Sequence, residues 1–191
     1  IHKKGATMPI HMTTVVHDFF NSKKVRKAFL RIRLPLGLLL LVMIATRVRY
    51  DLFFSGMIVS VLGEMLQVWC FATIRTNKKL TTSGPYMFVR NPMYIGRFFQ
   101  LFGIILMTGS LWLMAIFSGI YYFYMVNRVK REEKMLQDLF GAEYESYCRT
   151  VNRFLPGFKA FDLAKLATFD KESFRHNHAI INILATVGCY I

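Results

Sequence analysis

Residues 52–74, "LFFSGMIVSVLGEMLQVWCFATI", decide the fold class because this run of 23 residues contains one charged side chain, Glu64. A helix of about 20 mostly apolar residues crosses a bilayer core of about 30 Å. The segment therefore predicts a transmembrane helix. A carboxylate at membrane depth is a functional candidate by default, although a protonated or paired Glu64 that holds helices together is the alternative. Gln67 lies one turn further along the same helix.

Three further segments have almost no charge. Residues 34–46 contain none, but they are short for a span without the residues before them. Residues 92–109 carry only Arg97, and residues 110–127 carry no charge. The last two segments run close to the length of a span, and they meet at a Gly-Ser step. This arrangement predicts two helices joined by a tight hairpin.

A fifth apolar stretch, residues 178–191, has only 14 residues. It fits either a shortened last span or a helix packed on the membrane face. Taking it as a span, we predict an all-α fold, a multi-span integral membrane helical bundle with four transmembrane helices and a fifth at the C-terminus. Residues 34–191 would form this membrane-embedded domain. Residues 1–33 predict a basic, amphipathic interfacial segment, with a plain charged lead-in to the first span as the alternative.

Positive charge is distributed unevenly between the two sides of such a bundle. The chain carries a net charge of +14, and 54% of its 191 residues are hydrophobic. If the chain crosses at each predicted span, 22 of its 25 Lys and Arg fall on one side and two on the other, with Arg97 inside a span. Lys and Arg mark the cytoplasmic side, so we expect a multi-pass protein with its N-terminus and active site cytoplasmic. Whether the cell membrane or the endoplasmic reticulum is its location stays open, and no nucleic-acid partner is needed.

The polar residues outside the spans gather in two regions, residues 75–91 and the chain after residue 127. Both regions fall on the cytoplasmic side, so we expect a functional site to be built where they meet. The three cysteines, Cys70, Cys148 and Cys189, lack metal-ligand spacing, and the first and last lie in apolar runs. We therefore expect free thiols and no metal site.

The first polar region ends in "SGPYMFVRNPMYIG", residues 83–96. Asn91 followed by Pro92 predicts a helix start, with the Asn side chain accepting hydrogen bonds from the first-turn amides and Pro at the first helical position. The free amides and positive dipole end would then face the loop and form a site for a carboxylate or phosphate. Tyr86 and Tyr94 would flank this site. The alternative is a plain helix cap with interfacial tyrosines.

The second polar region begins with charges that directly follow the fourth predicted span. Arg128 and Glu132 are four residues apart and therefore share one helix face. A solvated charge run, with these two residues as an exposed ion pair, is one interpretation. The other is a ligand site just above the bilayer, where anionic and cationic ends of ligands are held by opposite charges.

Together, "SGPYMFVRNPMYIG" and "REEKMLQDLFGAEYESYCRTVNRFLPGF", residues 131–158, resemble the isoprenylcysteine carboxyl methyltransferases and their phospholipid-methyltransferase relatives. The matching positions are Gly84, Tyr86, Arg90, Pro92, Tyr94, Gly96, Glu132, Glu133, Phe140, Gly141, Glu143 and Tyr144. The likeness covers about residues 60–158 and includes Gly63-Glu64. Asn91 stands where the family usually has His. Asn cannot titrate near neutral pH, so a binding or capping role survives this departure and a catalytic-base role does not.

The resemblance implies S-adenosylmethionine as cofactor, bound through residues 78–96 and 128–158. The implied cofactor-binding residues are Leu80, Thr81, Tyr86, Asn91, Pro92, Met93, Tyr94 and Glu132. Arg128 is the implied catalytic residue, since it would hold the carboxylate of the methyl acceptor, and Glu64 is a second candidate for substrate binding. The expected acceptor is a prenylated cysteine or a similar lipophilic acid reached from the membrane lipids.

Three alternatives remain at this point. A phospholipid N-methyltransferase would need a base to deprotonate its amine acceptor, whereas a carboxylate is already ionised. An NADPH-dependent sterol-type reductase would need Arg75, Lys78 and Lys79 to hold a further phosphate. A non-enzymatic membrane anchor would leave the two matched motifs without a role.

Overall fold

The computed structural model describes residues 22, 35, 37, 39, 42–74, 79–166, 168, 170–177, 179–188 and 190. In this part of the chain every regular element is a helix, which confirms the all-α prediction for the described residues. The predicted interfacial segment, residues 1–33, lies outside the described residues apart from position 22, as does about half of the first predicted span. The elements are α3 (Tyr50–Thr73), the 3-10 helix η1 (Gly84–Met87), α4 (Pro92–Leu106), α5 (Leu111–Thr150), α6 (Leu163–Leu166), α7 (Lys171–His176) and α8 (Ala179–Gly188).

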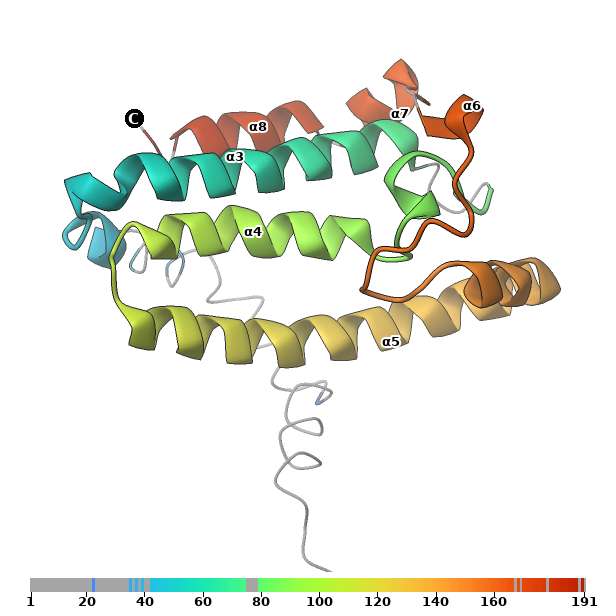
Figure 1. Ribbon diagram of the computed structural model, residues 1–191, viewed down its shortest axis with the longest axis horizontal. Helices are drawn as coiled ribbons and strands as arrows, with labels where there is room; N and C mark the ends of the chain where they lie inside the picture. Colours follow the sequence, from blue (N-terminus) through green and yellow to red (C-terminus); the bar gives the residue numbers. More distant parts are fainter. Residues whose placement is uncertain are drawn as a thin grey trace, which may run out of the picture.

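The four longer helices lie side by side in the order α8, α3, α4, α5 (Figure 1). α3 and α4 run antiparallel, and α5 returns along α4 after a short turn, so the hairpin predicted at the Gly-Ser step is confirmed. Ser110 caps the start of α5, since its Oγ accepts a hydrogen bond from the Leu113 amide at 3.4 Å.

Glycines allow α3 and α4 to pack backbone to backbone. Gly56 and Gly63 on α3 face Gly103 and Gly96 on α4, and the two glycines of each helix are seven positions apart. A Cβ added to Gly56 would lie 2.5 Å from the carbonyl oxygen of Gly103, and one added to Gly63 would lie 2.5 Å from that of Gly96. Small residues of this kind let apolar helices approach closely where hydrophobic burial gives little driving force. The α3–α4 pair is therefore the rigid centre on which the polar end is built.

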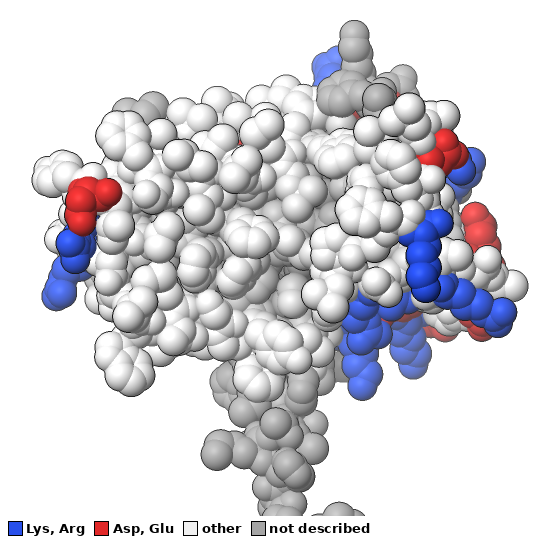
Figure 2. All heavy atoms as spheres, viewed as in Figure 1, with Lys and Arg blue, Asp and Glu red and all other residues white. Residues whose placement is uncertain are grey.

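α3 is long and apolar enough to cross a membrane, and among the described residues it alone meets that test. α4 has 15 residues and α8 has 10. The ten residues of α8 rise only about 15 Å, half of a bilayer core, and they lie along α3. The multi-span bundle with a fifth C-terminal span thus stays a prediction. In Figure 2 the middle of the visible face carries no charged atoms, and the Lys, Arg, Asp and Glu side chains gather at its ends.

α5 continues well beyond its apolar first half. In Figure 1 it extends past the ends of α3 and α4 on the side of η1. The helix is interrupted at Gly141, where φ is 49° and ψ is −119°, and it then continues to Thr150. The second half of α5 supplies Glu132 and Glu133 on one side of the break and Tyr144 and Tyr147 on the other.

Candidate active site

The first motif folds into a tight, buried turn. Gly84 has a φ of 58°, a left-handed conformation that glycine adopts without strain. A Cβ at this position would lie 2.8 Å from the Thr73 Oγ1 at the end of α3. The four residues of η1 are all buried, and Tyr147 Oη donates a 2.6 Å hydrogen bond to the carbonyl oxygen of Tyr86. The end of α5 therefore holds the turn from the far side.

The segment after α5 lies directly beside this turn. The Arg90 amide donates to the carbonyl oxygen of Asn152 at 2.9 Å, and the Gly157 amide donates to that of Phe88 at 2.8 Å. These two backbone hydrogen bonds join the two polar regions of the sequence. The expectation that they meet in space is confirmed.

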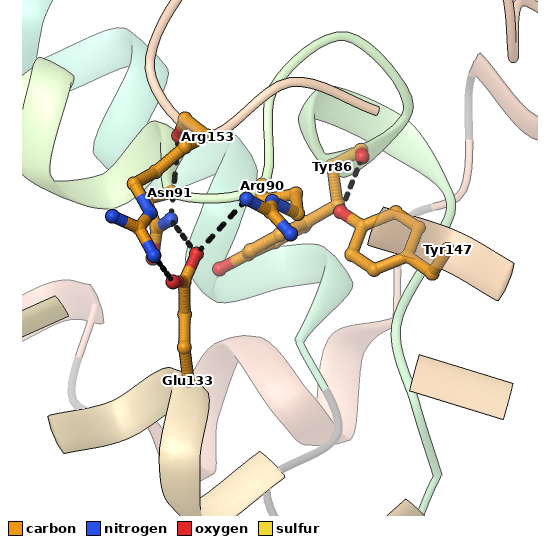
Figure 3. Close-up of polar contacts among 6 residues, drawn as sticks. All are labelled: Tyr86, Arg90, Asn91, Glu133, Tyr147 and Arg153. Atoms are coloured by element: carbon orange, nitrogen blue, oxygen red, sulfur yellow. Dashed lines mark hydrogen bonds and ion pairs between the residues drawn. The ribbon is translucent and has the colours of Figure 1, made fainter. Parts of the chain in front are cut away.

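Glu133 is the centre of the polar contacts between the two motifs (Figure 3). Its side chain is only 9% exposed. One carboxylate oxygen accepts a hydrogen bond from Asn91 Nδ2 at 3.3 Å and pairs with Arg90 at 3.5 Å. The other accepts a charge-assisted hydrogen bond from Arg153. A buried carboxylate needs such partners to offset its desolvation, so Glu133 fixes the start of α4 and residue 153 to α5.

The predicted capping role of the Asn91 side chain is wrong. Asn91 does occupy the position before α4, and Pro92 is the first helical residue, as predicted. Its side chain, however, makes no cap hydrogen bond and donates its amide to Glu133 and to the Arg153 carbonyl oxygen. The charge-assisted donation from Nδ2 to the buried carboxylate sets the orientation of this side chain, and in that orientation its Oδ1 accepts no hydrogen bond from the first-turn amides. The first-turn amides of α4 consequently receive no cap from the Asn91 side chain.

Tyr94, Arg128 and Glu132 form a second cluster next to this helix start. Arg128 Nε donates to Glu132 Oε1 at 2.7 Å and lies 3.3 Å from Tyr94 Oη. The hydrogen bond to Tyr94 and the charge of Glu132 raise the pKa of the Arg128 guanidinium. Arg128 and Glu132 remain 45% and 32% exposed. They form the ion pair that their spacing allowed, and their predicted ligand roles stay predictions.

The other predicted cofactor residues differ in burial. Leu80 is buried in a small cluster with Tyr144, Tyr147 and Val151, so its backbone rather than its side chain is available to a ligand. Tyr86 and Pro92 are buried, whereas Thr81, Met93 and Tyr94 are half-buried. Tyr94 is thus the more accessible of the two predicted aromatic walls.

Glu64 lies in a separate polar network inside the helix layer. Its carboxylate accepts hydrogen bonds from Gln100 Nε2 at 2.7 Å, from Thr186 Oγ1 at 2.9 Å and from Asn182 Nδ2 at 2.9 and 3.0 Å. These donors come from α4 and α8 and join both helices to α3. The network matches the alternative of a paired glutamate that holds helices together, and the substrate-binding role of Glu64 stays a prediction.

Sequence reasoning missed the structural partners of both glutamates. Arg153 lies in the second motif, 20 positions after Glu133, and no spacing rule connects the two. Nor does one connect Tyr147 with the Tyr86 carbonyl oxygen, 61 positions earlier. Asn182 and Thr186 stand four residues apart in an apolar stretch, and that pairing of polar residues on one helix face was the available signal. Cys70 is a buried free thiol, as predicted, and Cys189 lies outside the described residues.

The residues predicted to bind phosphate in the reductase alternative lie mostly outside the described part of the chain. Arg75 and Lys78 lie outside the described residues, and Lys79 is exposed. Within the described residues, no group of three or more His, Cys, Asp and Glu side chains is placed to hold a metal ion.

Comparison with known proteins places this arrangement in a family. The profile of the phospholipid methyltransferase family matches residues 36–143. The chain is 29% identical to the cobalt-zinc-cadmium resistance protein CzcN of Cupriavidus metallidurans over 65% of this chain and 58% of that protein. It is 28% identical to the nickel-cobalt-cadmium resistance protein NccN of Alcaligenes xylosoxydans xylosoxydans over 65% and 59%. It is 32% identical to the protein-S-isoprenylcysteine O-methyltransferase of Schizosaccharomyces pombe over 40% and 33%.

The chain therefore spans less than two thirds of the length of these relatives. No solved structure matches it. The family profile covers more than half of the chain and contains both the turn and the Glu132-Glu133 pair. Together with the isoprenylcysteine methyltransferase match, it confirms the resemblance inferred from the motifs, and the chain belongs to the phospholipid methyltransferase family.

Proposed function

We propose that the protein is a membrane methyltransferase that uses S-adenosylmethionine to methylate a lipophilic acceptor. The observation that carries the proposal is that a site suited to an anionic group and a site suited to a cationic group lie on either side of Tyr94. The amide-rich start of α4 lies on one side, without a side-chain cap, and the partly exposed Arg128–Glu132 pair lies on the other. Membership of the phospholipid methyltransferase family supports the same chemistry.

These residues fit the two charged ends of the cofactor. The α4 start can hold the methionyl carboxylate through its free amides and its positive dipole end. Glu132 can pair with the ammonium, and Tyr94 can form a wall of the adenosine pocket. When bound, S-adenosylmethionine supplies an electrophilic methyl group on its sulfonium.

The residues of the site then have two kinds of role: some bind the ligands, and others keep the binding residues in place. Arg128 lies closer than Glu132 to the apolar half of α5, so we assign it to the acceptor and to orienting the reacting oxygen. Glu133 and its partners touch neither ligand in this proposal. They keep the α4 start and the segment after α5 fixed, because positioning within a fraction of an ångström decides the rate of such a transfer.

A lipophilic carboxylate, such as that of a prenylated cysteine, is the acceptor that the charges favour. An amine must lose a proton before it attacks, so its enzyme needs a base near the operating pH. Asn91 cannot supply one, and both neighbouring glutamates are engaged by arginines. A phospholipid amine is the second candidate, favoured by the name of the family whose profile matches.

Cofactor identity is tested by thermal unfolding of the purified protein with S-adenosylhomocysteine or NADPH. We expect S-adenosylhomocysteine to raise the unfolding temperature, because a ligand that binds only the native state stabilises it. NADPH should leave it unchanged. Stabilisation by NADPH alone would contradict the proposal and favour the reductase alternative.

Acceptor chemistry is tested with methyl-labelled cofactor and two acceptors, a prenylcysteine analogue and phosphatidylethanolamine. We expect label in the prenylcysteine analogue as a base-labile ester. Transfer only to phosphatidylethanolamine would overturn the carboxylate assignment and leave the methyltransferase assignment standing.

The roles of Arg128 and Glu132 are separated by measuring cofactor affinity and turnover for each variant. Glu132→Gln should weaken S-adenosylhomocysteine binding by roughly tenfold to a hundredfold, since a lost charge-assisted contact costs about 1.5–3 kcal/mol. Arg128→Ala should lower turnover by a similar factor with nearly unchanged cofactor affinity. Lys130→Ala, which removes an exposed charge from the same helix, is the control. Equal changes in both quantities for both variants would identify a purely structural ion pair.

A further inference from the structure

The segment that follows α5, residues 153–166, exposes large apolar side chains beside the site. Leu155, Phe158, Phe161 and Leu163 are all exposed, Leu155 at 76% and Phe158 at 73%. Basic residues alternate with them, because Arg153, Lys159 and Lys165 lie in the same segment with a single acid, Asp162. Large apolar side chains rarely gather on a surface that faces only water.

Four contacts fix where this segment lies. At its start the Gly157 amide bonds to the Phe88 carbonyl oxygen, and the Phe88 ring lies 5.6 Å from that of Phe158 and 5.9 Å from that of Phe161. Just beyond its end, the Asp170 amide donates to the carbonyl oxygen of Ala72 at 2.9 Å. Ala72 belongs to the last turn of α3. The segment is thus held at the level where the apolar helix ends, as its path past η1 and the end of α3 shows (Figure 1).

We infer that residues 153–166 are a membrane-interface anchor that binds the headgroup layer of an anionic bilayer. The inference needs only that α3 lies in a bilayer, and it does not depend on methyl transfer. At the level where α3 leaves the hydrocarbon, the surroundings are the headgroup and acyl boundary. Apolar side chains bury there to a depth of about 5–10 Å, and lysines beside them contact lipid phosphates.

The alternation of residues supports this partner over an apolar protein surface. Lys159 stands between Phe158 and Phe161, and Lys165 follows Leu163 within the same short stretch. Lysine is depleted in the centres of protein interfaces but is favoured at a lipid surface, where its stem is buried and its ammonium reaches the phosphates. Lys165 also pairs with Asp162 at 3.1 Å, and Arg153 pairs with Glu133. Lys159 is therefore the basic side chain of the segment that has no ion pair among the described residues.

The anchor would set the depth of the candidate active site. The Gly157 amide donates a hydrogen bond to Phe88, and Asn152, directly before the segment, accepts one from Arg90 in the turn before α4. A segment seated in the headgroup layer would therefore hold Tyr94 and Arg128 at the height where the polar end of a lipophilic acceptor lies.

The test uses the full chain in lipid nanodiscs and a tryptophan placed in the segment. Phe158→Trp is the first probe, and Leu155→Trp is the second because replacing Phe158 disturbs its contact with Phe88. The matched control is Leu139→Trp, an exposed leucine about 42 Å of helix rise beyond Leu111 on α5. Emission from the native Trp69 and Trp112 is subtracted with the parent protein.

We expect both segment probes to show blue-shifted emission and to lose intensity when the lipids carry bromine near the headgroup end of their chains. The Leu139→Trp probe should keep its intensity with brominated lipids and be quenched by acrylamide in water. If both segment probes behave like the control, the segment faces water or another protein, and the inference is wrong.

The charge requirement is tested by changing the lipid and the lysines. Quenching of Leu155→Trp should fall when phosphatidylglycerol is replaced by phosphatidylcholine. It should also fall in anionic lipid when Lys159→Glu and Lys165→Glu are added, whereas Lys130→Glu should have no effect. Equal quenching in all these cases would overturn the preference for an anionic surface.

Discussion

Replacing Glu133 is the most direct test of how the polar end is built, because its neighbour in the sequence provides a matched control. Glu132 and Glu133 are adjacent, carry the same group and each face arginine, but their burial differs. Glu133 is 9% exposed and has Arg90, Arg153 and Asn91 as partners, whereas Glu132 is 32% exposed and pairs with Arg128. Glu133→Gln and Glu132→Gln therefore make the same chemical change in two environments.

The two losses in stability should differ several-fold. Removing one partner of a buried ion pair costs about 3–5 kcal/mol. We expect about 3 kcal/mol for Glu133→Gln, since Arg153 is 44% exposed and can turn to water while Arg90 remains buried. The exposed pair at Glu132 is worth only about 0.3–0.5 kcal/mol. For a chain of this size, about 3 kcal/mol corresponds to a fall of roughly 6–12 °C in unfolding temperature.

The assay is thermal unfolding in detergent, with and without S-adenosylhomocysteine. Glu133→Gln should lower the unfolding temperature by several degrees and keep the increase caused by the ligand. Glu132→Gln should leave the unfolding temperature of the free protein nearly unchanged and reduce that increase, because it weakens ligand binding. Equal destabilisation by the two changes, or a larger loss from Glu132→Gln, would refute the assignment of Glu133 as the structural member of the pair.

Three further outcomes follow from the packing. Gly63→Ala should prevent recovery of folded protein, because its Cβ would collide with the α4 backbone. Gly119→Ala is the control: open space surrounds this position, so the change should be neutral or stabilising. The yield of folded protein from size-exclusion chromatography compares the two variants. Burial raises the pKa of Tyr147, so its contribution to stability should be constant up to about pH 10 and fall above that pH, where the unfolded chain ionises first. Tyr147→Phe should cost about 1 kcal/mol of stability at neutral pH, because it removes the hydrogen bond to Tyr86. In denaturant titrations the same variant should show a weaker fall in stability above about pH 10. Asn182→Ala should cost about 1–3 kcal/mol by removing a donor from Glu64, which unfolding of the purified variant would measure.

The sequence predicted those features that depend on local chemistry. Hydropathy gave α3, α4 and the apolar half of α5, since each is a run long enough to be recognised without knowing its neighbours. The turn at Gly84 and the helix break at Gly141 both depend on positive φ, which glycine adopts without strain. The meeting of the two polar regions was predicted by assigning each loop to one side of the membrane. That assignment requires only that successive helices run in opposite directions.

The features that the sequence did not predict depend on contacts between distant residues. Nothing local indicates that the glycines of α3 face those of α4, although their equal spacing on the two helices is visible afterwards. Asn91 has the propensity of a helix cap, and it was assigned that role. A buried carboxylate on another helix, 42 positions away, takes its amide instead. The cap would need the Asn91 Oδ1 to accept from a local amide, and the contact with Glu133 needs its Nδ2 to donate. Which orientation the side chain takes is decided only in the folded chain.

Helix geometry explains why the two adjacent glutamates of the second motif have different surroundings. Successive residues of an α-helix point about 100° apart, so Glu132 and Glu133 cannot serve the same surface. Glu133 points to the start of α4 and to Arg153, where its charge is neutralised by buried partners. Glu132 points to Tyr94 and Arg128, where it stays accessible. Adjacent positions can thus supply one carboxylate that is buried between the two motifs and one that stays partly exposed, as the proposed role of Glu132 in binding the cofactor ammonium requires. Two glutamates four residues apart on one helix face would share one environment.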